Sequence, residues 1–159
     1  MEIRYSLCLP RDAATVPVVR NMIGAGLERL GVEQDCTSDV KVAVTEACSN
    51  VLKHTAGTQN EYSVEIEIDE FRCRIRVVDT GAGFDHASIG GGDADASSES
   101  GRGIQLMRAL VDDLKFVSES ELGTVVQLTK TLRLTSESVI HRLMTGPGKL
   151  PRASGSSPR

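Results

Sequence analysis

Three polar residues at four-residue spacing, Glu46, Asn50 and His54, stand in the segment TEACSNVLKH, whose other positions follow a helical pattern. Because positions four apart on a helix differ in direction by only about 40°, these side chains form one row beside an apolar stripe. A carboxylate and an amide in such a row suit metal-assisted phosphoryl transfer, in which one orients or deprotonates an attacking hydroxyl and the other holds Mg²⁺. The alternative is a polar boundary, half exposed to water and without chemistry.

Two glycine pairs offer a second kind of chemistry, the holding of a phosphate. Asp79 ends a strand-like run and is followed by Gly81 and Gly83, whereas Gly101 and Gly103 open a helical segment. Free N–H groups at a helix start attract a phosphate, and glycine permits its close approach. Each pair alone is equally compatible with an ordinary turn or helix start, since VVDTGAGF matches neither a Walker A loop nor a dinucleotide fingerprint.

The elements that must position these residues follow from the apolar periodicity. The expected order is strand, helix, helix, two strands, loop, helix and two strands, with a short helix after Ser136. The first helix is expected to end at Gly31, and the second to start at a cap formed by Thr37 or Ser38. Since hairpins supply most of the sheet, we expect a two-layer α/β (α+β) sandwich, with a mixed, mostly antiparallel sheet and helices on one face.

The clearest hairpin joins the alternating runs EYSVEIEID and FRCRIRVVD. If Asp69 and Glu70 form the turn, Glu67 faces Arg72 on one side of the pair while apolar residues meet on the other. One face is then core, and the other is a ladder of opposite charges in water. Such a ladder is far more often a solvated surface than a binding patch.

Composition limits the classes of function. The chain has 159 residues, of which 40% are hydrophobic, and this length fits one domain plus a tail. An excess of 22 acidic over 18 basic residues, with two Tyr, three Phe and no Trp, argues against nucleic acid as a direct partner. No apolar run reaches the length of a membrane span, no signal-peptide pattern is present, and the four cysteines form no CxxC pair. We therefore expect a cytoplasmic protein without a membrane segment or a zinc site.

Taken together and in their order, these motifs resemble those of the GHKL ATPase superfamily, which shares the Bergerat ATP-binding fold. EACSNVLKH is similar to its N box, DTGAGF to its first glycine box, GRGIQLM to its second, and Gly123 with Thr124 to its threonine motif. The resemblance covers about residues 1–133. The small size, and the lack of a phosphoacceptor box around any histidine, favour the stand-alone anti-sigma-factor serine kinases of bacterial partner-switching systems.

This resemblance implies a site for ATP and Mg²⁺. In such a site Glu46 is the general base toward a serine hydroxyl, Asn50 is the Mg²⁺ ligand, and Asp79 accepts a hydrogen bond from the adenine amino group. Residues 85–100 form the lid over ATP, and His54 either packs at the helix end or contacts a phosphate. The other cofactor-binding positions that the resemblance implies are Gly81, Gly83, Gly101, Arg102, Gly103 and Thr124, with Arg102 either paired with a phosphate or facing solvent.

The motif positions and the composition also set boundaries. Residues 1–134 are expected to form a histidine-kinase-like ATPase domain, residues 135–145 a short C-terminal helix and residues 146–159 a disordered tail. The resemblance implies a homodimer that sequesters a sigma factor, with Arg20 as a contact, and that phosphorylates a STAS-type anti-sigma-factor antagonist. The alternatives are a non-catalytic ATP-binding module that sequesters a protein partner, and a simple ATP hydrolase.

Overall fold

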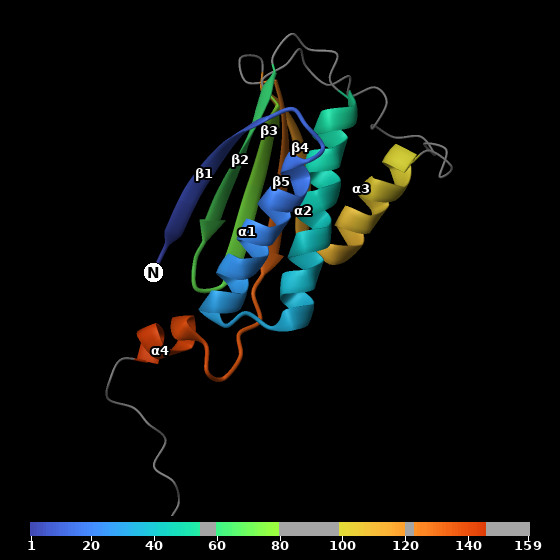
Figure 1. Cartoon of the computed structure of the whole chain (residues 1–159). Helices are drawn as coiled ribbons and strands as arrows, with labels where there is room; N and C mark the ends of the chain where they lie inside the picture. The colour runs from blue at the N-terminus through green and yellow to red at the C-terminus, as the bar shows by residue number, and fades with distance from the viewer. Residues whose placement is uncertain (55–59, 80–98, 120–122, 146–159) are drawn as a thin grey trace, which may run out of the picture.

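The computed structural model describes residues 1–54, 60–79, 99–119 and 123–145, which form a five-stranded sheet with helices packed on one face (Figure 1). Its strands are β1 (Ile3–Pro10), β2 (Glu61–Ile68), β3 (Arg72–Asp79), β4 (Asp113–Glu119) and β5 (Gly123–Thr131). Their order in the sheet is β1-β2-β3-β5-β4, and every neighbouring pair is antiparallel. The expected two-layer α+β architecture is confirmed, with a sheet that is antiparallel across all described strands rather than mixed.

Three helices, α1 (Thr15–Leu30), α2 (Gln34–His54) and α3 (Glu99–Leu110), lie side by side over the sheet, and the short α4 (Val139–Thr145) lies beyond the lower end of α1 (Figure 1). Apolar residues recur every three or four positions along α1, and this stripe is buried: Val16, Val19, Ile23 and Leu27. α2 occupies the middle of the helical layer, where it packs against α1, α3, β3 and β5. Different faces of α2 therefore meet the two neighbouring helices and the centre of the sheet.

The boundary between α1 and α2 agrees with the expectation at one residue and corrects it at another. Gly31 ends α1 with φ of 81°, and its N–H donates to the carbonyl of Glu28 at 3.0 Å. This left-handed conformation is the usual reason for glycine after a helix. The predicted cap at Thr37 is wrong, because α2 already begins at Gln34 and the Thr37 N–H donates to the carbonyl of Glu33 at 2.9 Å.

The hairpin of β2 and β3 is present, but its turn lies one residue later than predicted. Ile68 pairs with Cys73, and Asp69 N–H donates to the Arg72 carbonyl at 2.9 Å, so that Glu70 and Phe71 form the turn. The carboxylate of Asp69 accepts the N–H groups of Phe71 and Arg72, both at 2.8 Å. Aspartate favours the first position of a turn because its side chain can make such bonds.

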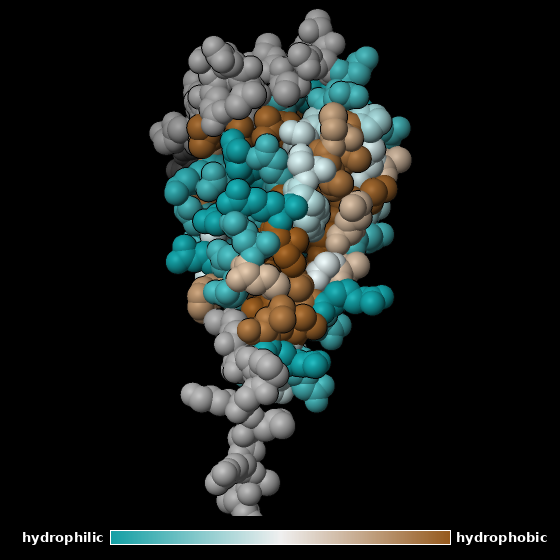
Figure 2. All heavy atoms as spheres, turned by 90° about the vertical axis from the view of Figure 1, so that its left-hand side faces the viewer, coloured by the Kyte–Doolittle hydropathy of each residue, from teal (hydrophilic) through white to brown (hydrophobic). Residues whose placement is uncertain are grey.

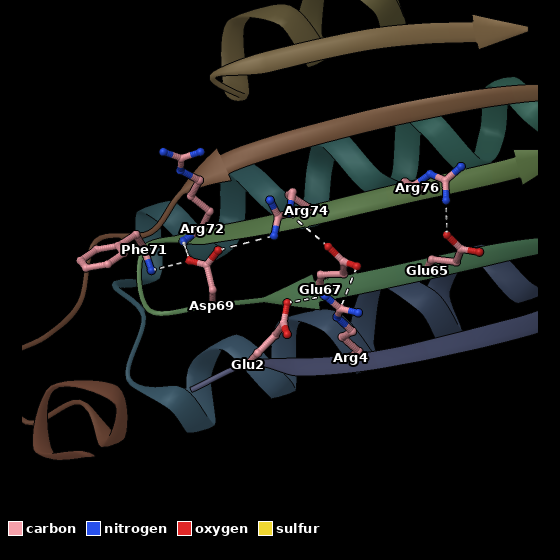
Figure 3. A network of polar contacts seen from close by, with 9 residues as sticks. All are labelled: Glu2, Arg4, Glu65, Glu67, Asp69, Phe71, Arg72, Arg74 and Arg76. Carbon is pink, nitrogen blue, oxygen red and sulfur yellow. Dashed lines mark hydrogen bonds and ion pairs between the residues drawn. The ribbon is translucent and has the colours of Figure 1, made fainter. Parts of the chain in front are cut away.

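The shifted turn moves the cross-strand partners by two residues and leaves each side chain on its predicted face. Glu67 now faces Arg74, and Glu65 faces Arg76 at 2.7 Å, as the close-up of the open sheet face shows (Figure 3). The core face of the same strands carries buried apolar residues. Seen from the β1 edge, hydrophilic side chains gather on one side of the molecule and hydrophobic ones alongside them (Figure 2).

Candidate nucleotide and phosphoryl-transfer site

The polar row of α2 faces the first half of α3. Glu46 is half-buried and Asn50 is buried, with only 5% of the latter residue exposed. A Cβ atom added to Gly103 on α3 would lie 2.7 Å from Glu46 Oε2 and 3.7 Å from Asn50 Oδ1. The Glu46 carboxylate would therefore have to move from this position to admit a side chain at Gly103. The fold thus brings together residues of the predicted N box and of the predicted second glycine box.

Asp79 lies at the end of β3, and 4% of it is exposed. In the sheet register its Cα is paired with Tyr62 on β2 and with Thr124 on β5. The two residues predicted to lie near adenine, Asp79 and Thr124, are therefore direct neighbours on adjacent strands. The C-terminal end of α2 lies at this same end of the sheet (Figure 1), and α2 packs against both β3 and β5.

Arg11, which the sequence analysis did not single out, contacts Asp79 directly. Its Nη2 lies 3.1 Å from Asp79 Oδ2 and also donates a hydrogen bond to the carbonyl of Val51 at 2.8 Å. The exposed fractions of the two charged side chains are 12% for Arg11 and 6% for Asp79. The sequence held a weak signal for this contact, a charged residue placed directly after Pro10 at the end of the first strand.

Two further titratable groups at this end, Tyr62 and Cys48, have raised pKa values. The Tyr62 hydroxyl is hydrogen-bonded with Thr15 Oγ1 at 2.8 Å, and burial raises the pKa of Tyr62 above its ordinary value. Burial also raises the pKa of Cys48 to about 12, with a hydrogen bond from Tyr62 acting in the opposite direction. The tyrosine and the thiol therefore stay protonated near pH 7, beside the ion pair of Arg11 and Asp79.

A shallow pocket of about 280 Å³ opens on the other side of Glu46, between α1 and α2. Two basic residues line it, Arg20 from α1 and Lys41 from α2, together with Ser38, Val42 and Thr45. The stem of Lys41 crosses α1 at Gly24, where an added Cβ atom would lie 2.8 Å from Lys41 Cδ. Arg20, predicted as a partner contact, thus lines the same pocket as the predicted general base.

The donor set fits Mg²⁺ held partly by a nucleotide. Within the described ranges no group of three or more His, Cys, Asp and Glu side chains could hold a metal ion. Mg²⁺ usually keeps several waters and takes one or two protein oxygens together with substrate phosphates. Asn50 Oδ1 and the nearby Glu46 carboxylate are oxygen ligands of the kind that this cation prefers, and both approach Gly103.

Several residues that were predicted to belong to the site are not among the contacts described above. Gly81, Gly83 and residues 85–98 of the predicted lid lie outside the described residues. The last two residues assigned to the lid, 99 and 100, belong instead to the first turn of α3. Gly101 and Arg102 follow in the same helix, and Arg102 is exposed. His54 is the last residue of α2.

A comparison with protein families decides what kind of domain this is. Residues 9–130 match the histidine kinase-like ATPase domain. The chain belongs to this family. The predicted relationship to the GHKL ATPases is thereby confirmed, and the family match includes both the α2 row and the β3–β5 end of the site.

Relatives within the family are named as kinases. The chain is 34% identical over 134 residues to the serine-protein kinase RsbW of Bacillus velezensis, covering 78% of this chain and 82% of that protein. It is 28% identical over 139 residues to RsbW of Bacillus cereus, covering 82% and 86%. A crystal structure of the RsbU and RsbW domains of a Mycobacterium tuberculosis protein matches 82% of this chain and 33% of that chain, with a TM-score of 0.63 and 18% identity. This structure supports the fold.

The helices were also compared with the requirements of a membrane span. Among the described residues, no helix is both long enough and apolar enough to cross a bilayer.

Proposed function

We propose that this protein is an anti-sigma factor and an ATP-dependent protein serine kinase, which sequesters a sigma factor and phosphorylates a STAS-type anti-sigma-factor antagonist. The observation that carries the proposal is the contact of Glu46 and Asn50 with Gly103, within a family whose matched relatives are serine-protein kinases. It joins a carboxylate, an amide oxygen and a glycine near a helix start, which are the parts that phosphoryl transfer to a hydroxyl requires.

In the proposed reaction Glu46 accepts the proton of the attacking serine hydroxyl. A bond forms between the serine oxygen and the γ-phosphorus, the bond from that phosphorus to the bridging oxygen breaks, and ADP leaves. Asn50 would hold Mg²⁺, which would neutralise phosphate charge. In this proposal Gly101, Arg102 and Gly103 serve the phosphates, and Gly81 and Gly83 serve the nucleotide, as the motif resemblance implies.

At the other end of the nucleotide, Asp79 accepts a hydrogen bond from the adenine amino group. Thr124 is its neighbour on β5, which supports a shared role at the base. Burial of Asp79 also supports this role, because a base-recognising carboxylate must be shielded from competing water. Residues 85–98, with the start of α3, form the lid that closes over ATP.

The pocket beside Glu46 is the proposed entry for the acceptor serine. It is open to solvent, it contains the half-buried carboxylate, and Arg20 and Lys41 give its wall two positive charges. A protein partner with acidic residues near its reactive serine fits such a wall. Partner switching follows from this arrangement, since an antagonist bound at Arg20 competes with a sigma factor that uses the same residue. We further propose that the active form is a cytoplasmic homodimer.

The experiment that tests the proposal is incubation of the protein with labelled ATP, Mg²⁺ and candidate STAS-domain antagonists. Wild type is expected to label one serine of the true antagonist, and Glu46→Gln to bind ATP without transferring phosphate. Glu137→Gln, a change at an exposed glutamate near α4, is the matched control and is expected to behave as wild type.

Strong ATP binding without transfer to an antagonist that the protein demonstrably binds would overturn the kinase. That result would favour the non-catalytic binding module. Rapid ATP turnover in the absence of any acceptor would instead favour the simple hydrolase.

A further inference from the structure

Arg11 has no assigned role, yet its guanidinium lies 3.1 Å from the predicted adenine-binding carboxylate of Asp79. We propose that Arg11 is a positioning residue for base selection, which fixes Asp79 in the orientation that accepts the 6-amino group of adenine. This inference rests on the proposed function, in which Asp79 recognises the base.

One nitrogen of Arg11 makes two contacts. Nη2 lies 3.1 Å from Asp79 Oδ2 and 2.8 Å from the carbonyl oxygen of Val51. Each terminal guanidinium nitrogen carries two hydrogens, so it can donate to both oxygens at once. The carboxylate of Asp79 is therefore tied, through a single atom, to the main chain of α2.

The main chain of Arg11 is itself held in place. Its N–H donates to the carbonyl of Asn60 at 2.8 Å, directly beyond the pairing of Pro10 with Glu61 at the end of the β1–β2 ladder. The arginine thus starts from a fixed point on the sheet and reaches across to Asp79 at the end of β3. Because Arg11 is fixed both at its main chain and at its Nη2 atom, it restricts the rotation of the Asp79 carboxylate that it contacts.

The contact with Val51 connects the two ends of the proposed nucleotide site. Val51 lies in the last turn of α2, where a cation is favourable because of the helix dipole. The residue before it is Asn50, the proposed Mg²⁺ ligand. Arg11 therefore links the adenine end of the site to the helix turn that supports the phosphate end.

The burial of the pair explains why removing the arginine changes base recognition. Both side chains are mostly shielded from water, so loss of the arginine removes a charged contact that orients the carboxylate, and the carboxylate is freer to turn. That change alters the acceptor that the adenine amino group meets. A base with an oxo group at position 6 offers an acceptor there, which the ionised carboxylate repels, so the contrast between the two bases reports on Asp79.

A purely structural role for Arg11 would weaken the binding of all nucleotides equally. A positioning role changes the preference for one base over another. The measurement that separates them is the ratio of the dissociation constants of ITP and ATP, since these nucleotides have the same phosphates and differ in the base at position 6.

The experiment is titration of the full-length protein with ATP and with ITP, each with Mg²⁺, for wild type, Arg11→Met, Asp79→Asn and Arg133→Met. The last variant is the matched control, because Arg133 Nε lies 3.1 Å from Glu33 Oε2 in an exposed pair away from the site. Wild type and Arg133→Met are expected to prefer ATP by about tenfold or more, the worth of one hydrogen bond to a charged group. In Arg11→Met the preference is expected to fall to about threefold or less by the same measure.

The wild-type preference in a folded Arg11→Met variant would overturn the inference. If Asp79→Asn also keeps that preference, the proposed role of Asp79 in base recognition is wrong. The Asp79→Asn variant thus distinguishes a failure of the proposed function from a failure of the inference about Arg11. Should Arg11→Met not fold, Arg11→Gln carries the same prediction with an amide donor in place of the charge. If neither variant folds while Arg133→Met does, Arg11 acts in folding alone and the inference is overturned.

Discussion

Charged pairs occur in two regions of this molecule and differ in what surrounds them. On the open face of the sheet, Glu65 and Arg76 form a 2.7 Å contact with both side chains about 40% exposed (Figure 3). Beneath α2, Arg11 and Asp79 lie 3.1 Å apart and are almost completely covered. The length of the contact does not decide its importance: water competes for the exposed charges, whereas removing one member of the covered pair leaves a charge that is mostly shielded from water.

The difference in burial between the two pairs distinguishes the open sheet surface from the candidate site. The charged pairs on the open face of the sheet keep one side of the two-layer domain in water, and other pairs of opposite charge would serve equally well there. The covered pair holds one particular oxygen in one particular place. Where a carboxylate must recognise a ligand, the neighbours that restrict its motion matter more than the length of any single contact.

The largest effect is expected at the covered end from Gly103→Ala. The new Cβ would lie 2.7 Å from Glu46 Oε2 and force the carboxylate to move. Displacement of a catalytic group by about 1 Å lowers a rate by roughly a hundredfold, so phosphate transfer to the antagonist should fall by about that factor. Thermal stability should not fall in parallel, because alanine favours a helix over glycine by about 1 kcal/mol.

The control for that variant is Gly26→Ala on α1, where the added Cβ meets Tyr5 Oη at an ordinary 3.7 Å. It should retain the wild-type transfer rate. Full activity in Gly103→Ala would show that Glu46 does not act from its position against α3.

The second effect concerns stability. Arg11→Met removes a charged contact of a mostly covered carboxylate and one bond to the Val51 carbonyl, and should cost about 2–3 kcal/mol in the free energy of unfolding. Urea unfolding of the variant and of Arg133→Met gives the comparison. A loss no greater than that of the exposed control would remove the distinction between the two regions.

The third effect is smaller and sharpens the contrast from the other side. A double-mutant cycle on Glu65 and Arg76 should give a coupling energy below about 1 kcal/mol, which disappears at about 1 M salt as exposed charges are screened. The coupling of Arg11 with Asp79, measured in the same way, should persist in salt. Equal salt sensitivity of the two pairs would contradict this account.

The smallest effect is a dependence of stability on pH at Asp112. Its carboxylate accepts the N–H of Thr131, and this hydrogen bond lowers the pKa of Asp112 below the ordinary 3.8. The resulting stabilisation is present above about pH 4 and is lost as pH falls through the lowered pKa. Asp112→Asn keeps an acceptor without the charge, so its melting temperature should lie below that of wild type at pH 7 and approach it in acid. A difference that is constant with pH would exclude this origin.

Much of the fold could be predicted from local patterns. Alternation marked β1, β2 and β3, helical spacing marked α1 and α2, and Gly31 marked the end of α1 because a left-handed residue follows it. The start of α2 and the turn at Glu70 and Phe71 were missed. The turn depends on which N–H groups the Asp69 carboxylate accepts, and several partners are compatible with the same sequence. The start of α2 was missed because Thr37, a suitable capping residue by type, lies inside the helix with its buried hydroxyl unpaired among the described residues.

Less of the candidate site than of the fold could be predicted from the sequence. The spacing of Glu46 and Asn50 showed that they share a helix face, and the motif resemblance supplied the nucleotide beside them. Their contact with Gly103 and the role of Arg11 come from tertiary packing, which joins residues more than fifty positions apart. No periodicity in the sequence specifies such a contact.

The central claim is that Glu46, held against Gly103, removes the proton from an acceptor serine. Its most direct test is the single-turnover rate of phosphate transfer from saturating Mg-ATP to the antagonist, for wild type and for Glu46→Gln. The rate in the variant should be lower by about 10²–10⁴-fold, the usual contribution of a general base, while the dissociation constant of ATP changes by less than about threefold. Equal transfer rates in the two proteins would contradict the claim.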